Sequence, residues 1–194
     1  MPHTSPPDLL ALHGVRLLGY ADLSQLAARF DLDPAVVTAV LERAAERGEV
    51  TETSFADAGG WSLTEAGRQH NEAQLAEELD AVGARATVTQ VHEDFLPLNE
   101  TVAAACTAVQ LDPERAAYDQ AWQELSSVAA ELKVLQARLC EELDRFAGYH
   151  ARFASALFRA DEDRAYIAGT SVDSCHKVWF ELHEDLIASL GITR

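Results

Sequence analysis

The segment from residue 60 to residue 68, Gly-Trp-Ser-Leu-Thr-Glu-Ala-Gly-Arg, constrains the fold of this chain more than any other stretch. Its first half is typical of a short strand that ends in Leu-Thr, and residues 64–82 continue it as an amphipathic helix. Residues 50–53 are a second strand candidate, and the turn-forming residues 56–59 separate the two strands. The sequence therefore predicts a β-hairpin that leads directly into a helix.

Three helices are predicted before this hairpin, over residues 9–18, 21–30 and 34–47. Asp33 is placed to cap the N-terminus of the third helix, and Pro34 occupies its first position, where a missing N–H costs nothing. The apolar residues that we expect in the core of this region are Leu26, Val37, Leu41, Trp61 and Leu63.

This order of elements resembles the winged helix-turn-helix domain of bacterial transcriptional regulators of the multiple-antibiotic-resistance-regulator (MarR) type. The resemblance covers residues 9–82, about two-fifths of the chain. It implies that the third helix enters the major groove of DNA and that the hairpin, or wing, contacts the backbone. The residues that would then contact DNA are Thr38, Arg43 and Arg47. The predicted organisation is a flexible leader (1–7), a winged helix-turn-helix domain (8–83) and an all-α C-terminal domain (84–194).

The charge of the chain argues against this DNA role. The formal net charge is −17, and residues 1–83 contain five arginines and no lysine against fourteen acids. The N-terminal half of the third helix carries no base, and Arg43 and Arg47 lie among three glutamates in and just after its second half. The wing contains Glu52 and Asp57 and no base. DNA binding requires cations that displace condensed counterions, and they are absent from the places where this fold would use them.

Length and composition place the chain among globular proteins of one or two small domains. Its 194 residues are 48% hydrophobic, which is enough to bury a core. No apolar run approaches the length of a membrane span, and no signal sequence opens the chain, so we expect a cytoplasmic protein with no membrane contact. Cys106, Cys140 and Cys175 are widely spaced and odd in number, which favours free thiols over disulfides.

Residues 84–194 read as helix throughout, and we expect four or five helices in an antiparallel bundle. Pro97 should bend or restart the first of them. Apolar residues then recur every three or four positions from Leu125 to Leu157. Such a long apolar seam either breaks, near Ser126-Ser127 or at Gly148, or forms part of a dimer interface. A last helix is predicted over residues 174–190.

Four arginines recur at intervals of seven in this region: Arg138, Arg145, Arg152 and Arg159. The first interpretation is a solvated helix face whose arginines pair with acids three or four residues away. Arg152 has no such acid, so it is the best candidate to anchor a small anionic ligand. The binding residues predicted on this basis are Tyr149, His150, Arg152, His176, Trp179 and His183.

His176 and His183 lie seven residues apart in the last helix, and Cys175 or His150 could join them around zinc. The spacing lacks the short motifs of zinc sites, so a structural role is favoured and no metal or cofactor is predicted. No nucleophile elbow, phosphate-binding glycine loop or dinucleotide motif is present, which argues against an enzyme.

Two functions follow. In the first, the protein is a winged-helix regulator whose C-terminal domain dimerises and senses a ligand or partner. In the second, the winged helix is a protein-docking module, and the chain is an accessory or regulatory subunit of a larger enzyme or complex.

Overall fold

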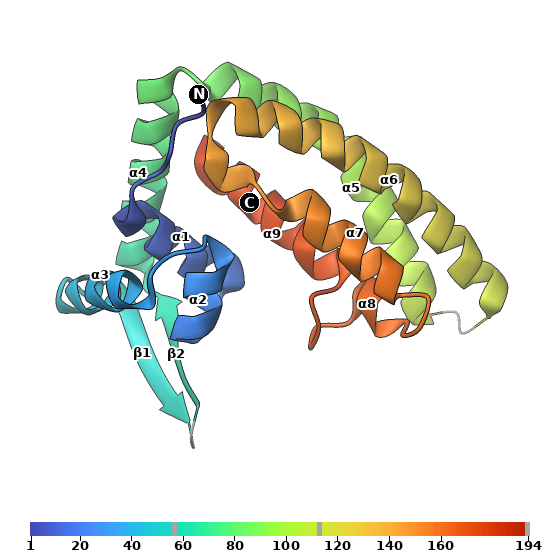
Figure 1. The fold of residues 1–194 in the computed structure, drawn as a ribbon, viewed down its shortest axis with the longest axis horizontal. Helices are drawn as coiled ribbons and strands as arrows, with labels where there is room; N and C mark the ends of the chain where they lie inside the picture. The colour runs from blue at the N-terminus through green and yellow to red at the C-terminus, as the bar shows by residue number, and fades with distance from the viewer. Residues whose placement is uncertain (56–57, 112–113, 193–194) are drawn as a thin grey trace. The chain divides into compact units, whose positions relative to one another are not determined.

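The computed structural model describes residues 1–55, 58–111 and 114–192. They form mainly helices and one two-stranded antiparallel sheet (Figure 1). Contacts divide the chain into two units. We call His3–Ala84, with the residues from Ile187 onward, the N-terminal unit, and Arg85–Leu186 with Met1–Pro2 the helical unit.

The N-terminal unit contains three helices, a hairpin and a fourth helix in chain order: α1 (Pro7–Leu18), α2 (Leu23–Arg29), α3 (Pro34–Glu46), β1 (Val50–Phe55), β2 (Ala58–Leu63) and α4 (Glu65–Val82). The hairpin pairs Val50 with Leu63, and the predicted turn residues Ala56-Asp57 lie outside the described part of the chain. This confirms the predicted helices and strands, with longer strands than expected.

Local sequence signals explain where these helices begin. Asp33 Oδ1 accepts a hydrogen bond from the Ala35 N–H at 2.8 Å, so the predicted cap of α3 is confirmed. Asp22 and Gln25 form a reciprocal capping box at the start of α2. Each cap satisfies backbone N–H groups that the first helical turn leaves without a carbonyl partner.

The core of the N-terminal unit gathers the apolar faces of α1, α2 and α3. Leu26, Val37 and Leu41 are buried, and Trp61 and Leu63 pack against them while partly exposed, which confirms the predicted core. A smaller cluster joins Leu9, Leu10, Leu75 and Ala188.

Residues 3–7 do not form the loose leader that their prolines suggested. Ser5 is buried, and His3 Nε2 lies 3.4 Å from Glu78 Oε1 of α4. The segment therefore lies against α4, and the local sequence does not reveal its contact with Glu78.

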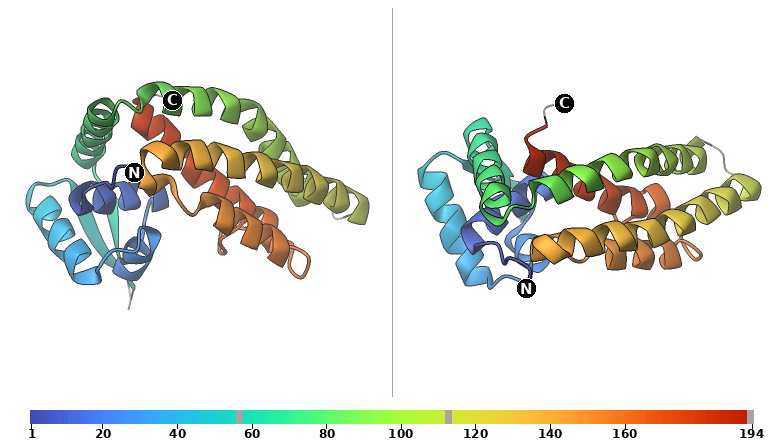
Figure 2. Two further views of the ribbon diagram at one scale, coloured as in Figure 1. Left: turned by 45° about the horizontal axis from the view of Figure 1, so that its top comes forward. Right: turned by 90° about the horizontal axis from the view of Figure 1, so that it is seen from above.

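The helical unit consists of α5 (Arg85–Leu111), α6 (Arg115–Glu142), a 3-10 turn (Asp144–Phe146), α7 (Tyr149–Arg159), α8 (Ala165–Ala168) and α9 (Cys175–Leu190), whose last residues belong to the N-terminal unit. The long helices α5 and α6 lie side by side in Figures 1 and 2. No strand occurs among the described residues of this unit, as predicted.

Pro97 does not restart a helix, because α5 runs from Arg85 to Leu111 with Pro97 inside it. Pro97 and Glu93 are both exposed. The carbonyl that loses its hydrogen bond to the proline nitrogen therefore lies on the solvent side, where water can satisfy it.

The apolar seam breaks at one of the two predicted places. Helix α6 ends at Glu142, and Gly148, with φ of 92°, precedes α7. Leu125, Leu132 and Phe153 are fully buried within the single chain. The seam is thus the core of the helical unit: of the two predicted alternatives the break is observed, and the seam side chains are covered within the chain.

Candidate functional site

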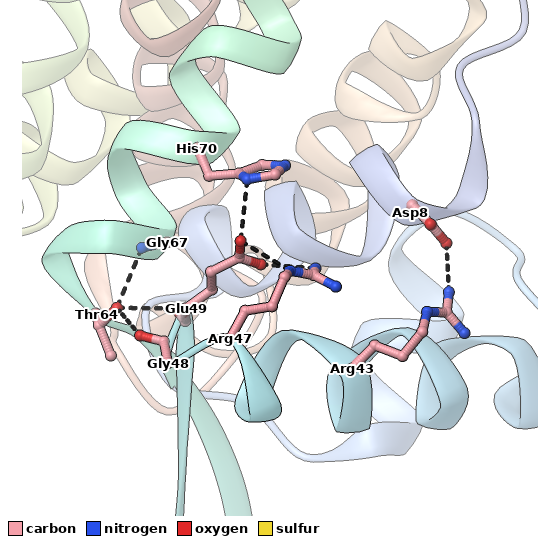
Figure 3. A network of polar contacts seen from close by, with 8 residues as sticks. All are labelled: Asp8, Arg43, Arg47, Gly48, Glu49, Thr64, Gly67 and His70. Carbon is pink, nitrogen blue, oxygen red and sulfur yellow. Dashed lines mark hydrogen bonds and ion pairs between the residues drawn. The ribbon is translucent and has the colours of Figure 1, made fainter.

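The two arginines predicted to contact DNA are each held by a carboxylate of their own unit (Figure 3). Arg43 donates to Asp8 at 2.9 Å in a half-exposed pair. Arg47 donates to Glu49 from two nitrogens, with Nε–Oε1 and Nη2–Oε2 distances of 2.9 and 2.7 Å. Both guanidinium groups are therefore neutralised where a regulator would need them free for phosphates.

Glu49 is the centre of a network that joins three elements of the N-terminal unit. Its side chain is 8% exposed, and His70 of α4 places Nδ1 3.0 Å from Glu49 Oε1. Its backbone carbonyl accepts hydrogen bonds from Thr64 N–H at 3.0 Å and from Thr64 Oγ1 at 3.1 Å. Thr64 also caps α4 by accepting from Gly67 N–H. The network fixes the end of α3 to β1 and to the start of α4.

Arg47 lowers the pKa of Glu49 through its hydrogen bonds, against the opposing effect of burial, and His70 adds to the lowering. A carboxylate with a lowered pKa in the folded state contributes stability that is fully present above its ordinary value of 4.5. That contribution is lost as the pH falls through the lowered pKa.

We expect Arg47→Gln to reduce the free energy of unfolding of the N-terminal unit by about 1 kcal/mol at pH 7, since half-exposed Arg47 is screened by water. The variant should also lose less stability than the wild type as the pH falls below 4.5, because only His70 then lowers the pKa of Glu49. Urea titrations from pH 7 to pH 3, followed by circular dichroism and by tryptophan fluorescence, measure both effects. An unchanged pH profile would contradict the role given to Arg47.

Thr38 faces a different environment from the two arginines. Its hydroxyl donates to the Pro34 carbonyl at 2.9 Å, and it lines a groove of about 480 Å³ between α2, α3 and the hairpin. The full lining is Asp22, Leu23, Ser24, Thr38, Glu42, Glu52, Gly59 and Trp61. Three carboxylates and no base line this surface, which extends the acidity predicted for the third helix and the wing.

The prediction that Arg152 lacks an acidic partner is wrong. Arg152 donates to Asp173 from Nε at 2.9 Å and from Nη2 at 2.6 Å. It also donates to Glu181 from Nη1 at 2.6 Å and from Nη2 at 3.0 Å. Burial opposes its charged form, but these hydrogen bonds outweigh it and raise the pKa of Arg152. The partners come from α9 and the segment before it, so spacing within α7 could not reveal them. The reason to place an anionic ligand on Arg152 disappears.

Two other arginines of the series, Arg138 and Arg145, also have partners far along the sequence, and the partner of Arg159 is seven residues away. Arg138 donates to Asp94 of α5 at 2.6 Å, and Arg159 Nη1 lies 3.2 Å from the Tyr166 hydroxyl. Arg145 is fully buried with Asp185 of α9. The interpretation as a solvated face held by local pairs is therefore wrong for Arg138, Arg145 and Arg152, whose carboxylate partners are distant in the sequence, whereas Arg159 is exposed.

The remaining residues predicted to bind a ligand fall into separate environments. Tyr149 is buried and donates to Asp185 Oδ2 at 2.8 Å. The Trp179 ring stacks on the Phe95 ring with their centroids 4.5 Å apart, and the centroid of the His183 ring lies 5.2 Å from that of Phe95. His150 is half-buried, while His176 is exposed. The structure brings Trp179 and His183 together through Phe95, in an aromatic cluster between α5 and α9.

The cysteines and histidines of this region show no feature of a reactive or metal-binding site. Burial raises the pKa of the Cys175 thiol to about 12 and that of Cys106 to about 11, so both are protonated at neutral pH. All three cysteines are free. Across the described ranges no group of three or more His, Cys, Asp or Glu side chains could hold a metal ion.

Sequence reasoning missed the roles of Glu49 and Asp185. Asp185 and Glu181 lie four residues apart on the apolar side of α9, beside buried Val178 and Leu182. Carboxylates on a buried helix face must be paired. Their position relative to the apolar residues was therefore a readable signal of buried ion pairs.

Comparison of the chain with protein-family models, with curated proteins and with solved structures finds no match. Among the helices described, none has the length and apolar character needed to cross a membrane.

Proposed function

We propose that the N-terminal unit is a winged-helix-like protein-docking module and that the chain is an accessory or regulatory subunit of a larger complex. The order of three helices, antiparallel hairpin and helix supports the winged-helix part of this proposal. In such a module α3 and the hairpin present the binding surface.

The observation that carries the docking role is the charge state of that surface. Arg43 and Arg47 are each paired with a carboxylate, and the groove beside α3 is lined by Asp22, Glu42 and Glu52. A polyanion such as DNA is repelled by this surface, because binding would require carboxylates to approach phosphates.

A DNA-binding regulator that senses a ligand is the second candidate, favoured by the element order alone. Two observations weaken this candidate. Arg43 and Arg47, the arginines predicted to contact DNA, are paired with carboxylates. Arg152, the predicted ligand anchor, is paired with Asp173 and Glu181. An oligomer remains compatible with either function, but it cannot use the buried seam between Leu125 and Leu157.

Binding to a labelled DNA duplex of random sequence, measured by fluorescence anisotropy, separates the two candidates. At a salt concentration of about 50 mM, where non-specific electrostatic binding is strong, we expect no saturable binding by the wild-type chain. The variant Glu42→Lys with Glu52→Lys serves as a control, since it should gain salt-sensitive binding if charge is what blocks DNA. Wild-type binding that weakens steeply with salt would overturn the docking proposal.

A further inference from the structure

The groove between α2, α3 and the hairpin has the chemistry of a cation site. We infer that it receives a lysine or arginine side chain from a basic segment of a partner protein, an inference that rests on the proposed docking function. The groove is about 480 Å³ in volume, within the range of ligand sites and larger than one side chain. It can therefore accept a segment of chain and not only an isolated cation.

The carboxylates of the groove differ from those elsewhere in the N-terminal unit. Asp8 and Glu49 are each paired with an arginine. Glu42 and Glu52 form no ion pair with a described residue, and no Lys, Arg or His lines the groove. Three acids from α2, α3 and β1 thus face one concave surface without a cation among its lining residues. An external guanidinium or ammonium group would supply the missing charge.

Trp61 gives the groove a second feature that suits a cation. Its indole ring is partly exposed in the groove and partly packed against the core. A cation over an indole face is attracted by the ring quadrupole, and tryptophan is the best aromatic residue for this contact. An aromatic wall beside carboxylates selects a basic side chain over a neutral one.

Hydrogen bonds hold the backbone that carries the Trp61 wall. The backbone N–H of Trp61 donates to the Ala21 carbonyl at 2.8 Å, and the backbone N–H of Ala21 donates to the Trp61 carbonyl at 3.2 Å. Next to it, Gly60 leaves room for the Tyr20 ring, since an added Cβ would lie 2.3 Å from Tyr20 Cζ. The Tyr20 hydroxyl donates to the Thr53 carbonyl at 3.1 Å. A preformed wall lowers the ordering cost of binding.

A second copy of this chain is a poor occupant. Each copy carries a formal net charge of −17, so self-association through an acidic groove would bring like charges together. A basic segment of another protein gains from the same field, which also speeds its approach. The occupant is therefore a Lys- or Arg-containing segment of a different chain.

The test uses the full-length protein and a fluorescein-labelled peptide in which arginine and lysine alternate with glycine and serine. A matched peptide replaces each basic residue by glutamine. The groove variant combines Asp22→Asn, Glu42→Gln and Glu52→Gln, and asparagine retains the helix cap of α2. The control variant, Glu46→Gln with Glu131→Gln and Glu141→Gln, removes the same charge from exposed positions that do not line the groove.

We expect the basic peptide to bind the wild type and the control variant with similar dissociation constants. The groove variant should bind it about tenfold more weakly, as the loss of close charge pairs predicts. Trp61→Leu should also weaken binding, with the fold checked by circular dichroism. Equal weakening in the groove and control variants, binding of the glutamine peptide, or no binding of the basic peptide would each overturn the inference. If any of these results occurs and the wild type still does not bind DNA, the groove is not the binding site, while the proposed docking function is retained for another surface of the N-terminal unit.

Discussion

Replacing Asp185 with asparagine is expected to lower the free energy of unfolding of the helical unit by about 3–5 kcal/mol. Asp185 and Arg145 are both fully buried, and Tyr149 donates to the second carboxylate oxygen of Asp185. Asparagine keeps the shape but removes the charge, so the Arg145 guanidinium stays in the interior without its full counter-charge. Urea unfolding at pH 7, followed by circular dichroism and by Trp179 fluorescence, measures the change.

The matched control is Asp94→Asn, because Asp94 also pairs with an arginine of the same series, Arg138, but at a partly exposed position. Its expected cost is much smaller than that of Asp185→Asn, because water screens the exposed pair. If Asp185→Asn lowered the free energy of unfolding no more than Asp94→Asn does, burial would not be the cause of the large effect expected at Asp185.

A double replacement tests whether the buried pair adds stability or only specificity. Arg145→Met with Asp185→Leu removes both charges and keeps apolar volume, so it should cost far less than Asp185→Asn alone. That result would mean that the pair fixes how α9 packs, while the cost of Asp185→Asn comes from the charge left behind.

Gly67→Ala is expected to destabilise the N-terminal unit by about 3 kcal/mol, as severe overpacking does. Alanine in place of a helical glycine normally stabilises by lowering chain entropy. Here an added Cβ would lie 1.9 Å from the Glu49 backbone oxygen, which itself accepts two hydrogen bonds from Thr64. The start of α4 would have to move away from β1. Urea unfolding followed by Trp61 fluorescence reports the loss.

Gly59→Ala is the control for this prediction. An added Cβ at Gly59 meets no atom within 4 Å, so the change in stability should be below about 0.5 kcal/mol. A neutral or stabilising effect of Gly67→Ala would show that α4 does not need the close approach to Glu49.

Much of the N-terminal unit could be predicted because its signals are local. Asp33 caps α3, Thr64 caps α4, and Val37 and Leu41, four residues apart, share the helix face that is turned to the core. These properties depend on neighbours within a few positions of the same helix or hairpin. The assignment of the whole arrangement to the winged-helix class stays a prediction.

Fewer features of the helical unit could be predicted from the sequence, because more of them depend on contacts between distant residues. The apolar seam was predictable from its period, and Gly148 was one of the two predicted break positions. The continuity of α5 through Pro97 was not predictable, since whether a proline interrupts a helix depends on what surrounds the freed carbonyl. The sequence also left open whether a second copy or helices of the same chain cover the seam, and in the structure helices of the same chain cover it.

The sequence by itself determined the helices, the hairpin, their order and the acidity of the predicted DNA-contact surface. Only the tertiary structure decided what the charges do. Arg152 meets Glu181 across 29 positions and Arg145 meets Asp185 across 40, whereas Arg47 meets Glu49 across two. A charge has no preferred sequence distance: its partner is whichever opposite group packing brings within a few ångströms, and that proximity also sets its energy through burial.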